Sequence, residues 1–310
     1  MRLLRHYTTI LPCNWKYGID QFQEGYHVWA THVMGLTNVG AVSTGPGGRR
    51  VGEKRGNTYP PPDKIGAMTV FLYAFREREL ILDLFEEYCG ARLTYNSMRF
   101  CGLPLDIPVG WDGKVRGFCD IMEAKVLEYE ELLTHNRIWL ERTRDIGIIS
   151  GPEAIALGLT GPALRGSGVP RDIRKDEPYA AYEEFDFHVA VGHRGDTYDR
   201  YLVRLEEFRE SIRIIRQAID GLPEGPIIGK VPRLIKPPAG ETYHAIESPK
   251  GELGYFIVCD GKSTSPYRFR VRPPSFCNLQ TLPRLIKGHM VADVVALIGS
   301  IDVVLGEVDR

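Results

Sequence analysis

The sequence predicts an α+β fold that is mainly helical, a helical bundle with a small antiparallel sheet. Two observations support this prediction. Long segments before Pro237 and Pro238 repeat apolar side chains at helical spacing, whereas beyond them apolar and polar residues alternate. Helices that are followed by a short run of strands and then by further helices are typical of the α+β class.

Three long helices are predicted, and together they indicate a bundle. The first spans 65–88 and ends near Gly90, a residue type that favours helix C-termini. The second spans 115–146, either unbroken or in pieces. The third begins after Asp196, which can cap its first turn, and runs to about residue 220.

Short strands follow the third helix. Residues 242–248, 254–260 and 267–272 alternate with period two and are separated by Gly, Ser and Pro, which predicts an antiparallel sheet. The chain then returns to helix near 279–286 and 291–298.

The C-terminal stretch is unusually apolar. Residues 290–305 carry few charges, and Glu307, Asp309 and Arg310 follow them. Termini are usually polar and frayed, and buried charges need partners or water. Two interpretations stay open, a well-packed final helix and strand or a functional site.

Residues 1–65 are predicted to form a separate segment. Within it, residues 43–63 are rich in Gly, Pro and charge, which indicates a linker. We therefore expect a second unit to comprise residues 66–310.

Composition limits the classes of function. The chain has 310 residues, of which 43% are hydrophobic and 25% charged, with a formal net charge of -1. This balance is typical of soluble globular proteins and argues against a nucleic-acid partner. No apolar run reaches the ~18 residues of a membrane span. We expect a chain that is soluble, or bound to a membrane through partners.

The cysteines indicate no metal site. Six are scattered singly, without a C-x-x-C pair, and are expected to be reduced packing residues. His188 and His193 lie five residues apart, which fits neither one helical face nor one strand face. We therefore expect this chain to bind no metal.

Charged segments are predicted to lie at the surface. Residues 174–179 and 230–241 look like surface or subunit-contact loops. Arg268, Arg270 and Arg272 alternate along one strand face, which indicates a solvated or partner-facing side.

Long ordered blocks of the sequence resemble the D subunit of NADH:quinone oxidoreductase, the respiratory complex I. The resemblance spans residues 66–310. It is carried by GAMTVFLYAFRERELILDLFEEYCGARLTYN (66–96), LTGPALRGSG (159–168), DIRKDEPYAAYEEFDFHVAVG (172–192), GDTYDRYLVRLEEFRESIRIIRQAI (195–219), KVPRLIKPPAGETYHAIESPKGELGYF (230–256) and the C-terminal stretch from Pro266.

The resemblance implies a fold related to the nickel–iron hydrogenase large subunit. The paired cysteines that hold the hydrogenase metal are absent, which excludes a hydrogenase site. The implied function is quinone reduction coupled to proton translocation, in a complex that oxidises NADH. The chain is not expected to be active alone, since it has neither a redox centre nor a nicotinamide-binding fingerprint.

The resemblance also implies partners. Quinone is a substrate, and the iron–sulfur cluster that reduces it is held by a neighbouring subunit, so this chain binds none. The chief partners are that cluster-bearing subunit and the membrane-arm subunit of the quinone site. The implied location is peripheral, on the cytoplasmic or matrix side of an energy-transducing membrane.

Three residues match positions of the family's quinone cavity, and a fourth matches its buried chain of charges. Phe71, Phe75 and Val304 are expected to line the quinone cavity, and Asp302 matches an acidic position in a buried chain of charges. Simpler alternatives stay open. Two Phe at i and i+4 also suit ordinary core packing, and Asp302 could be a strand-edge carboxylate facing water.

The sequence departs from the family at the quinone ligands. The His of an HPSTHG-type segment and a Tyr are absent, so the catalytic residues are unknown, and Lys64 occupies the position of the Asp that partners this His. Two alternatives to a working subunit follow. The chain could be a truncated, non-catalytic structural or interaction remnant, or residues 1–65 could be an artefact of gene prediction that replaces an ordinary N-terminal domain.

Overall fold

The computed structural model describes residues 68–93, 97–98, 102–230 and 234–309. The predicted segment 1–65 and its linker at 43–63 lie outside these residues. The chain divides into two compact units, and the described elements belong to the larger, Pro62–Val308, apart from the last residue of the final helix. This unit is mainly helical and carries a three-stranded antiparallel sheet, so the predicted fold class is confirmed.

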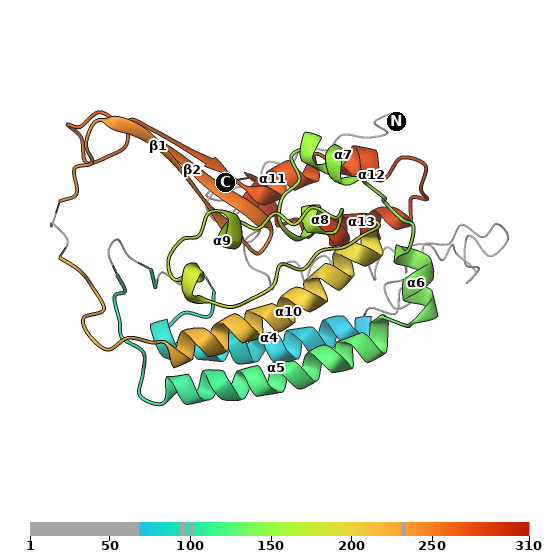
Figure 1. The fold of residues 1–310 in the computed structure, drawn as a ribbon, viewed down its shortest axis with the longest axis horizontal. Helices are drawn as coiled ribbons and strands as arrows, with labels where there is room; N and C mark the ends of the chain where they lie inside the picture. The colour runs from blue at the N-terminus through green and yellow to red at the C-terminus, as the bar shows by residue number, and fades with distance from the viewer. Residues whose placement is uncertain (1–67, 94–96, 99–101, 231–233, 310) are drawn as a thin grey trace, which may run out of the picture. The chain divides into compact units, whose positions relative to one another are not determined.

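Three long helices, α4 (Met68–Cys89), α5 (Trp111–Leu133) and α10 (Thr197–Asp220), lie side by side (Figure 1). The start of α5 pairs with the ends of both neighbours. Lys114 forms an ion pair with Glu87 at the end of α4, and Arg116 forms one with Asp220 at the end of α10. Helix α5 therefore runs antiparallel to the other two, as expected for a bundle.

The bundle core follows the heptad-like spacing of α5. Its buried side chains recur every three or four residues, which places them on one face. They are Val115, Cys119, Met122, Val126, Tyr129 and Leu133. Val70 of α4 and Leu205 and Ile212 of α10 complete the same cluster.

Side-chain caps fix where two helices begin. The Asn136 side chain accepts hydrogen bonds from Ile138 N and Trp139 N at 2.9 and 3.3 Å, which starts α6 (Arg137–Thr143). The predicted helix at 115–146 is therefore broken after α5. Asp196 accepts from Asp199 N at 2.8 Å, so the predicted cap of α10 is confirmed.

A second core lies between short helices. These are α7 (Gly151–Ala156), α8 (Gly161–Arg165), α11 (Pro274–Leu279), α12 (Leu282–Leu285) and α13 (Asp293–Ile301). Their buried cluster includes Leu164, Leu285, Leu297 and Ile301. The chain then enters α14 (Leu305–Asp309), so the final element is a helix and the expected final strand is wrong.

The sheet consists of β1 (Gly240–Ser248), β2 (Gly251–Cys259) and β3 (Arg268–Arg272), in that order. Ser248 pairs with Gly251, so the β1–β2 turn consists of Pro249 and Lys250 alone. All three predicted strands are confirmed within a few residues.

The charged segment 174–179 differs in part from its prediction as a surface or subunit-contact loop, although residues 175–178 are exposed. Residues 173–176 form helix α9 (Ile173–Asp176), and a 3-10 turn, η3 (Tyr182–Glu184), follows. The Arg174 side chain is largely buried, and its Nη2 lies 2.6 Å from Asp172 Oδ2. Because Asp172 is fully buried, its charge draws the neighbouring guanidinium inward.

None of the helices in the described part of the chain combines the length and the apolarity that crossing a membrane requires.

Candidate functional site

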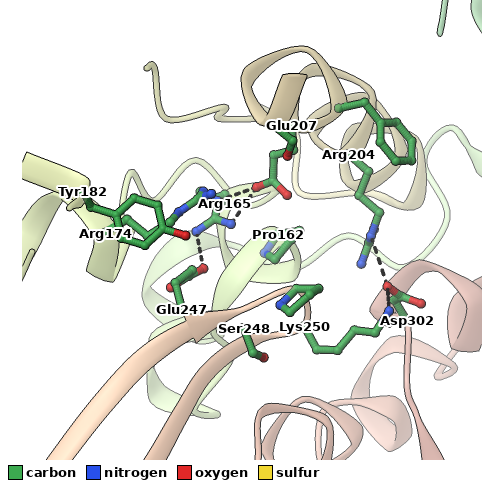
Figure 2. Close-up of a pocket in the computed structure, with 13 residues that line it drawn as sticks. Pro162, Arg165, Arg174, Tyr182, Arg204, Glu207, Glu247, Ser248, Lys250 and Asp302 are labelled. Atoms are coloured by element: carbon green, nitrogen blue, oxygen red, sulfur yellow. Dashed lines mark hydrogen bonds and ion pairs between the residues drawn. The ribbon is translucent and has the colours of Figure 1, made fainter. Parts of the chain in front are cut away.

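A pocket of about 470 Å³ lies among α8, α9, η3, α10, the end of β1, the β1–β2 turn and the residue that follows α13 (Figure 2). Two ionic clusters line it, one around Arg165 and one around Asp302. The complete lining is Pro162, Arg165, Arg174, Tyr182, Arg204, Glu207, Phe208, Ser211, Glu247, Ser248, Pro249, Lys250 and Asp302.

The first cluster surrounds Arg165, which is only 1% exposed. Its Nη2 donates to Glu207 of α10 at 2.6 Å and its Nη1 donates to Glu247 of β1 at 2.7 Å. Burial alone would lower the pKa of Arg165, but the attraction of its carboxylate neighbours outweighs burial and raises it. A guanidinium with this many charged acceptors joins α8, α10 and β1 at one point.

The two most buried carboxylates around Arg165 respond in opposite ways. Burial raises the pKa of Glu247 despite the attraction of Arg165. Burial acts in the same direction on Asp172, but there the hydrogen bonds from Arg174 and the charge of Arg165 outweigh it, so the pKa of Asp172 is lowered. Folding therefore stabilises the charged form of Asp172, but not that of Glu247.

This difference predicts a pH dependence of stability. A carboxyl whose pKa is depressed by folding stabilises the protein above its ordinary pKa, near 3.8 here, and this contribution is lost as pH falls through the lower folded value. We expect Asp172→Asn to lower the free energy of unfolding by about 2 kcal/mol at pH 7. The gap between variant and wild type should shrink below about pH 4, as measured by urea unfolding. A gap that stays constant down to about pH 2 would contradict this assignment.

The second cluster surrounds Asp302, the C-cap residue that directly follows α13. Asp302 adopts a left-handed conformation with φ of 54°, which is uncommon outside glycine. Its carboxylate forms an ion pair with Lys250 Nζ of the β1–β2 turn, and Arg204 Nε of α10 lies 3.9 Å away. Three separate elements therefore meet at this side chain, which is 40% exposed.

Helix α10 also fixes α13 through Arg200, one turn before Arg204. The buried guanidinium of Arg200 donates to Ser300 Oγ at 3.0 Å and to the carbonyls of Gly195 and Gly147 at 2.9 and 3.1 Å. Burial, with a smaller effect from Arg204, lowers the pKa of Arg200 to about 10. These bonds hold the end of α13 next to the pocket.

The other predicted site residues lie elsewhere. Phe71 and Phe75 contact each other on α4, with ring centroids 4.5 Å apart and ring planes tilted by 43°, and Phe71 is 36% exposed. Val304 is exposed, and its backbone N donates to Ser275 Oγ at 3.3 Å. Of the four predicted residues, only Asp302 lines the pocket in the described part of the chain.

Arg165, Glu247 and Lys250 were not predicted as site residues. A signal for Arg165 did exist, because its charge stands alone in the apolar and glycine-rich segment LTGPALRGSG. A lone charge in such a segment indicates burial with partners. Nothing in the local sequence of Glu247 or Lys250 indicates which groups they meet.

The pocket can hold polar groups, because seven of its thirteen lining side chains are charged. It does not suit an isoprenoid tail, which needs apolar walls. Within the described residues, no group of three His, Cys, Asp or Glu side chains is placed to hold a metal ion.

Comparison with known proteins identifies the family. Residues 64–237 and 230–310 match the family described as "Respiratory-chain NADH dehydrogenase, 49 Kd subunit". This chain belongs to that family. The match begins beside the start of the sequence resemblance and runs to the same end, so the predicted family is confirmed.

Individual members of the 49 Kd subunit family are similar over the same region. One of them, a second D subunit of NADH-quinone oxidoreductase from Solibacter usitatus, is 57% identical over 246 residues, which cover 79% of this chain and 66% of that protein. The D subunit of NADH-quinone oxidoreductase from Geotalea uraniireducens is 52% identical over 271 residues, which cover 79% of this chain and 69% of that protein. A second D subunit from Thermodesulfovibrio yellowstonii is 51% identical over 275 residues, which cover 79% of this chain and 68% of that protein. The match thus spans about two thirds of these relatives.

Proposed function

We propose that this chain is a subunit of NADH:quinone oxidoreductase and that it forms the quinone-reduction site together with a cluster-bearing neighbour. Electron transfer to quinone is then coupled to proton translocation by the whole complex. The observation that carries this proposal is the family match over 64–237 and 230–310, supported by relatives that are named as D subunits of this oxidoreductase.

Within this function, Phe71, Phe75 and Val304 line the apolar part of the quinone cavity. Their side chains are exposed or half-buried in the unit, so they are available to a ligand or to a partner subunit. Asp302 provides a carboxylate at the polar edge, where Lys250 and Arg204 neutralise it. Such a division suits a quinone, which has an apolar tail and two polar carbonyl oxygens.

The partners and the domain division belong to the same proposal. Residues 66–310 form the domain that this chain shares with the D subunits, and it binds the cluster-bearing subunit and the membrane-arm subunit of the quinone site. The iron–sulfur cluster belongs to the first of these partners. The complex then places this chain at the surface of an energy-transducing membrane, on its cytoplasmic or matrix side.

The direct test is complementation. The chain is expressed in a bacterium from which the gene for its own D subunit is deleted, and NADH:quinone reductase activity is measured in its membranes. We expect an assembled complex with inhibitor-sensitive quinone reduction. Assembly without turnover would instead favour the non-catalytic remnant, because the His and Tyr ligands of the family are absent from 66–310. Failure to assemble would contradict both.

Phe75→Ala should act on quinone binding. Removing the ring deletes the aromatic contact with Phe71 and part of the apolar lining, which is expected to raise the KM for quinone about tenfold, a loss of ~1.4 kcal/mol. The matched control is Phe269→Ala on β3, an exposed aromatic on a different element. Equal KM values for both variants and wild type would exclude Phe75 from the cavity.

A further inference from the structure

We infer that Lys250 is a positioning residue that fixes the carboxylate of Asp302 at the edge of the quinone site. The inference rests on the proposed function, because it assigns a task to Asp302 within that site. It adds a residue of the β1–β2 turn, which is not among the predicted site residues. Figure 2 shows the Lys250 side chain extended along the pocket toward Asp302.

The backbone carbonyl of Lys250 is held by one buried amide. Asn278 of α11 is fully buried, and its Nδ2 donates to the carbonyl of Lys250 at 3.0 Å. The Oδ1 of the same Asn278 accepts from Thr160 N at 3.1 Å, directly before α8. A single buried amide therefore ties the turn to α8 and α11, and both of its polar ends are satisfied.

Backbone packing fixes the turn further. A Cβ atom on Gly161 would lie 2.4 Å from Gly251 Cα, and one on Gly251 would lie 2.5 Å from Thr160 Oγ1. The two segments approach this closely because both positions are glycine. Lys250 thus projects from a rigid support rather than from a loose hairpin tip.

Asp302, the partner of Lys250, is also held in place by its neighbours in the chain. Ile301, directly before Asp302, is 1% exposed and belongs to the second core. The Oγ of Ser300 accepts a hydrogen bond from the buried guanidinium of Arg200. Of the described side chains, Lys250 and Arg204 form ion pairs with Asp302. At 3.9 Å the Arg204 contact is too long for a hydrogen bond, so the direct hydrogen bond comes from Lys250.

If Lys250 had a purely structural role, its loss would destabilise the fold. The Lys250 and Asp302 side chains are 24% and 40% exposed, and partly exposed ion pairs contribute little to stability. Loss of Lys250 should therefore leave folding and assembly intact. It should allow the Asp302 carboxylate to turn toward water, and a displacement of ~1 Å at a reacting site can cost up to about 100-fold in rate.

The experiment compares five variants in the assembled complex in membranes: Lys250→Met, Lys250→Arg, Asp302→Asn, the double variant Lys250→Met/Asp302→Asn, and the control Lys114→Met. Lys114 likewise forms an ion pair, with Glu87, but between α4 and α5. The kcat and the KM for a short-chain quinone are measured, and complex content is measured on native gels.

Lys250→Met is expected to lower kcat about tenfold at unchanged complex content, with KM changed less than kcat. Lys250→Arg should restore most of the rate, because it keeps the cation. The double variant should be no slower than Asp302→Asn, since Lys250 acts through that carboxylate. Lys114→Met should match wild type.

Two results separate the inference from the function on which it rests. If Asp302→Asn is slow but Lys250→Met is as fast as wild type, or if the losses add in the double variant, the inference is wrong and the proposed function stands. If Asp302→Asn and Phe75→Ala both behave as wild type, or no active complex assembles, the proposed quinone site itself is wrong, and the inference is wrong with it.

Discussion

Arg165→Met is expected to lower the free energy of unfolding by about 3–5 kcal/mol, the range measured when one partner of a buried ion pair is removed. The substitution leaves Glu247 buried without its cation, and it removes the second of the two cations near the buried Asp172, which keeps Arg174. Such a loss is severe, because the whole free energy of unfolding of a domain is only about 5–15 kcal/mol. Urea unfolding of the purified chain, followed by circular dichroism, measures it.

Arg165→Lys should recover only part of this loss. A single ammonium group cannot reproduce the fork of nitrogens that reaches Glu207, Glu247 and the Arg171 carbonyl together. The control is Arg137→Met, because Arg137 pairs with Glu141 on the surface of α6 and is 89% exposed in its side chain. This control should cost about 0.3–0.5 kcal/mol. Similar losses for Arg165→Met and Arg137→Met would show that the buried cluster does not hold α8, α10 and β1 together.

Gly161→Ala is expected to destabilise the fold by about 3 kcal/mol. Gly161 has φ of +67°, and its new Cβ would lie 2.4 Å from Gly251 Cα and 2.8 Å from the Lys250 carbonyl oxygen. These are backbone atoms, so no side-chain rotation relieves the overlap. The β1–β2 turn would have to move away from α8, and Lys250 would move with it.

Gly117→Ala provides the control with the opposite sign. Gly117 lies inside α5, and a Cβ there would meet nothing within 4 Å. The same substitution should therefore stabilise the chain by about 0.5–1 kcal/mol through helix propensity. Thermal unfolding of both variants checks the pair. A neutral Gly161→Ala would contradict the close packing of α8 against the turn.

Local patterns were sufficient to predict much of this fold. Apolar spacing predicts α5 and α10, Asp196 marks the start of α10, and alternation predicts β1, β2 and β3. These features depend on residues within a few positions of each other. The break between α5 and α6 has no Gly or Pro to mark it, and its one local signal is Asn136, a residue type that favours helix N-caps.

The ionic clusters could not be predicted in the same way. Arg165 meets Glu207 and Glu247 across 42 and 82 residues, and Lys250 meets Asp302 across 52 residues. Such pairings depend on tertiary packing, which no local pattern contains. Asp302 was singled out because of the family resemblance, whereas its position between Lys250 and Arg204 required the structure.

We propose that quinone binds in the assembled complex at a cavity that Phe71, Phe75 and Val304 line. Photolabelling of the assembled complex with a photoreactive quinone, followed by peptide mass spectrometry, tests it most directly. We expect labelled peptides from α4 and from the segment after α13, with labelling that excess unmodified quinone suppresses. Labelling confined to other subunits, or to peptides of the β1–β3 sheet, would contradict the claim.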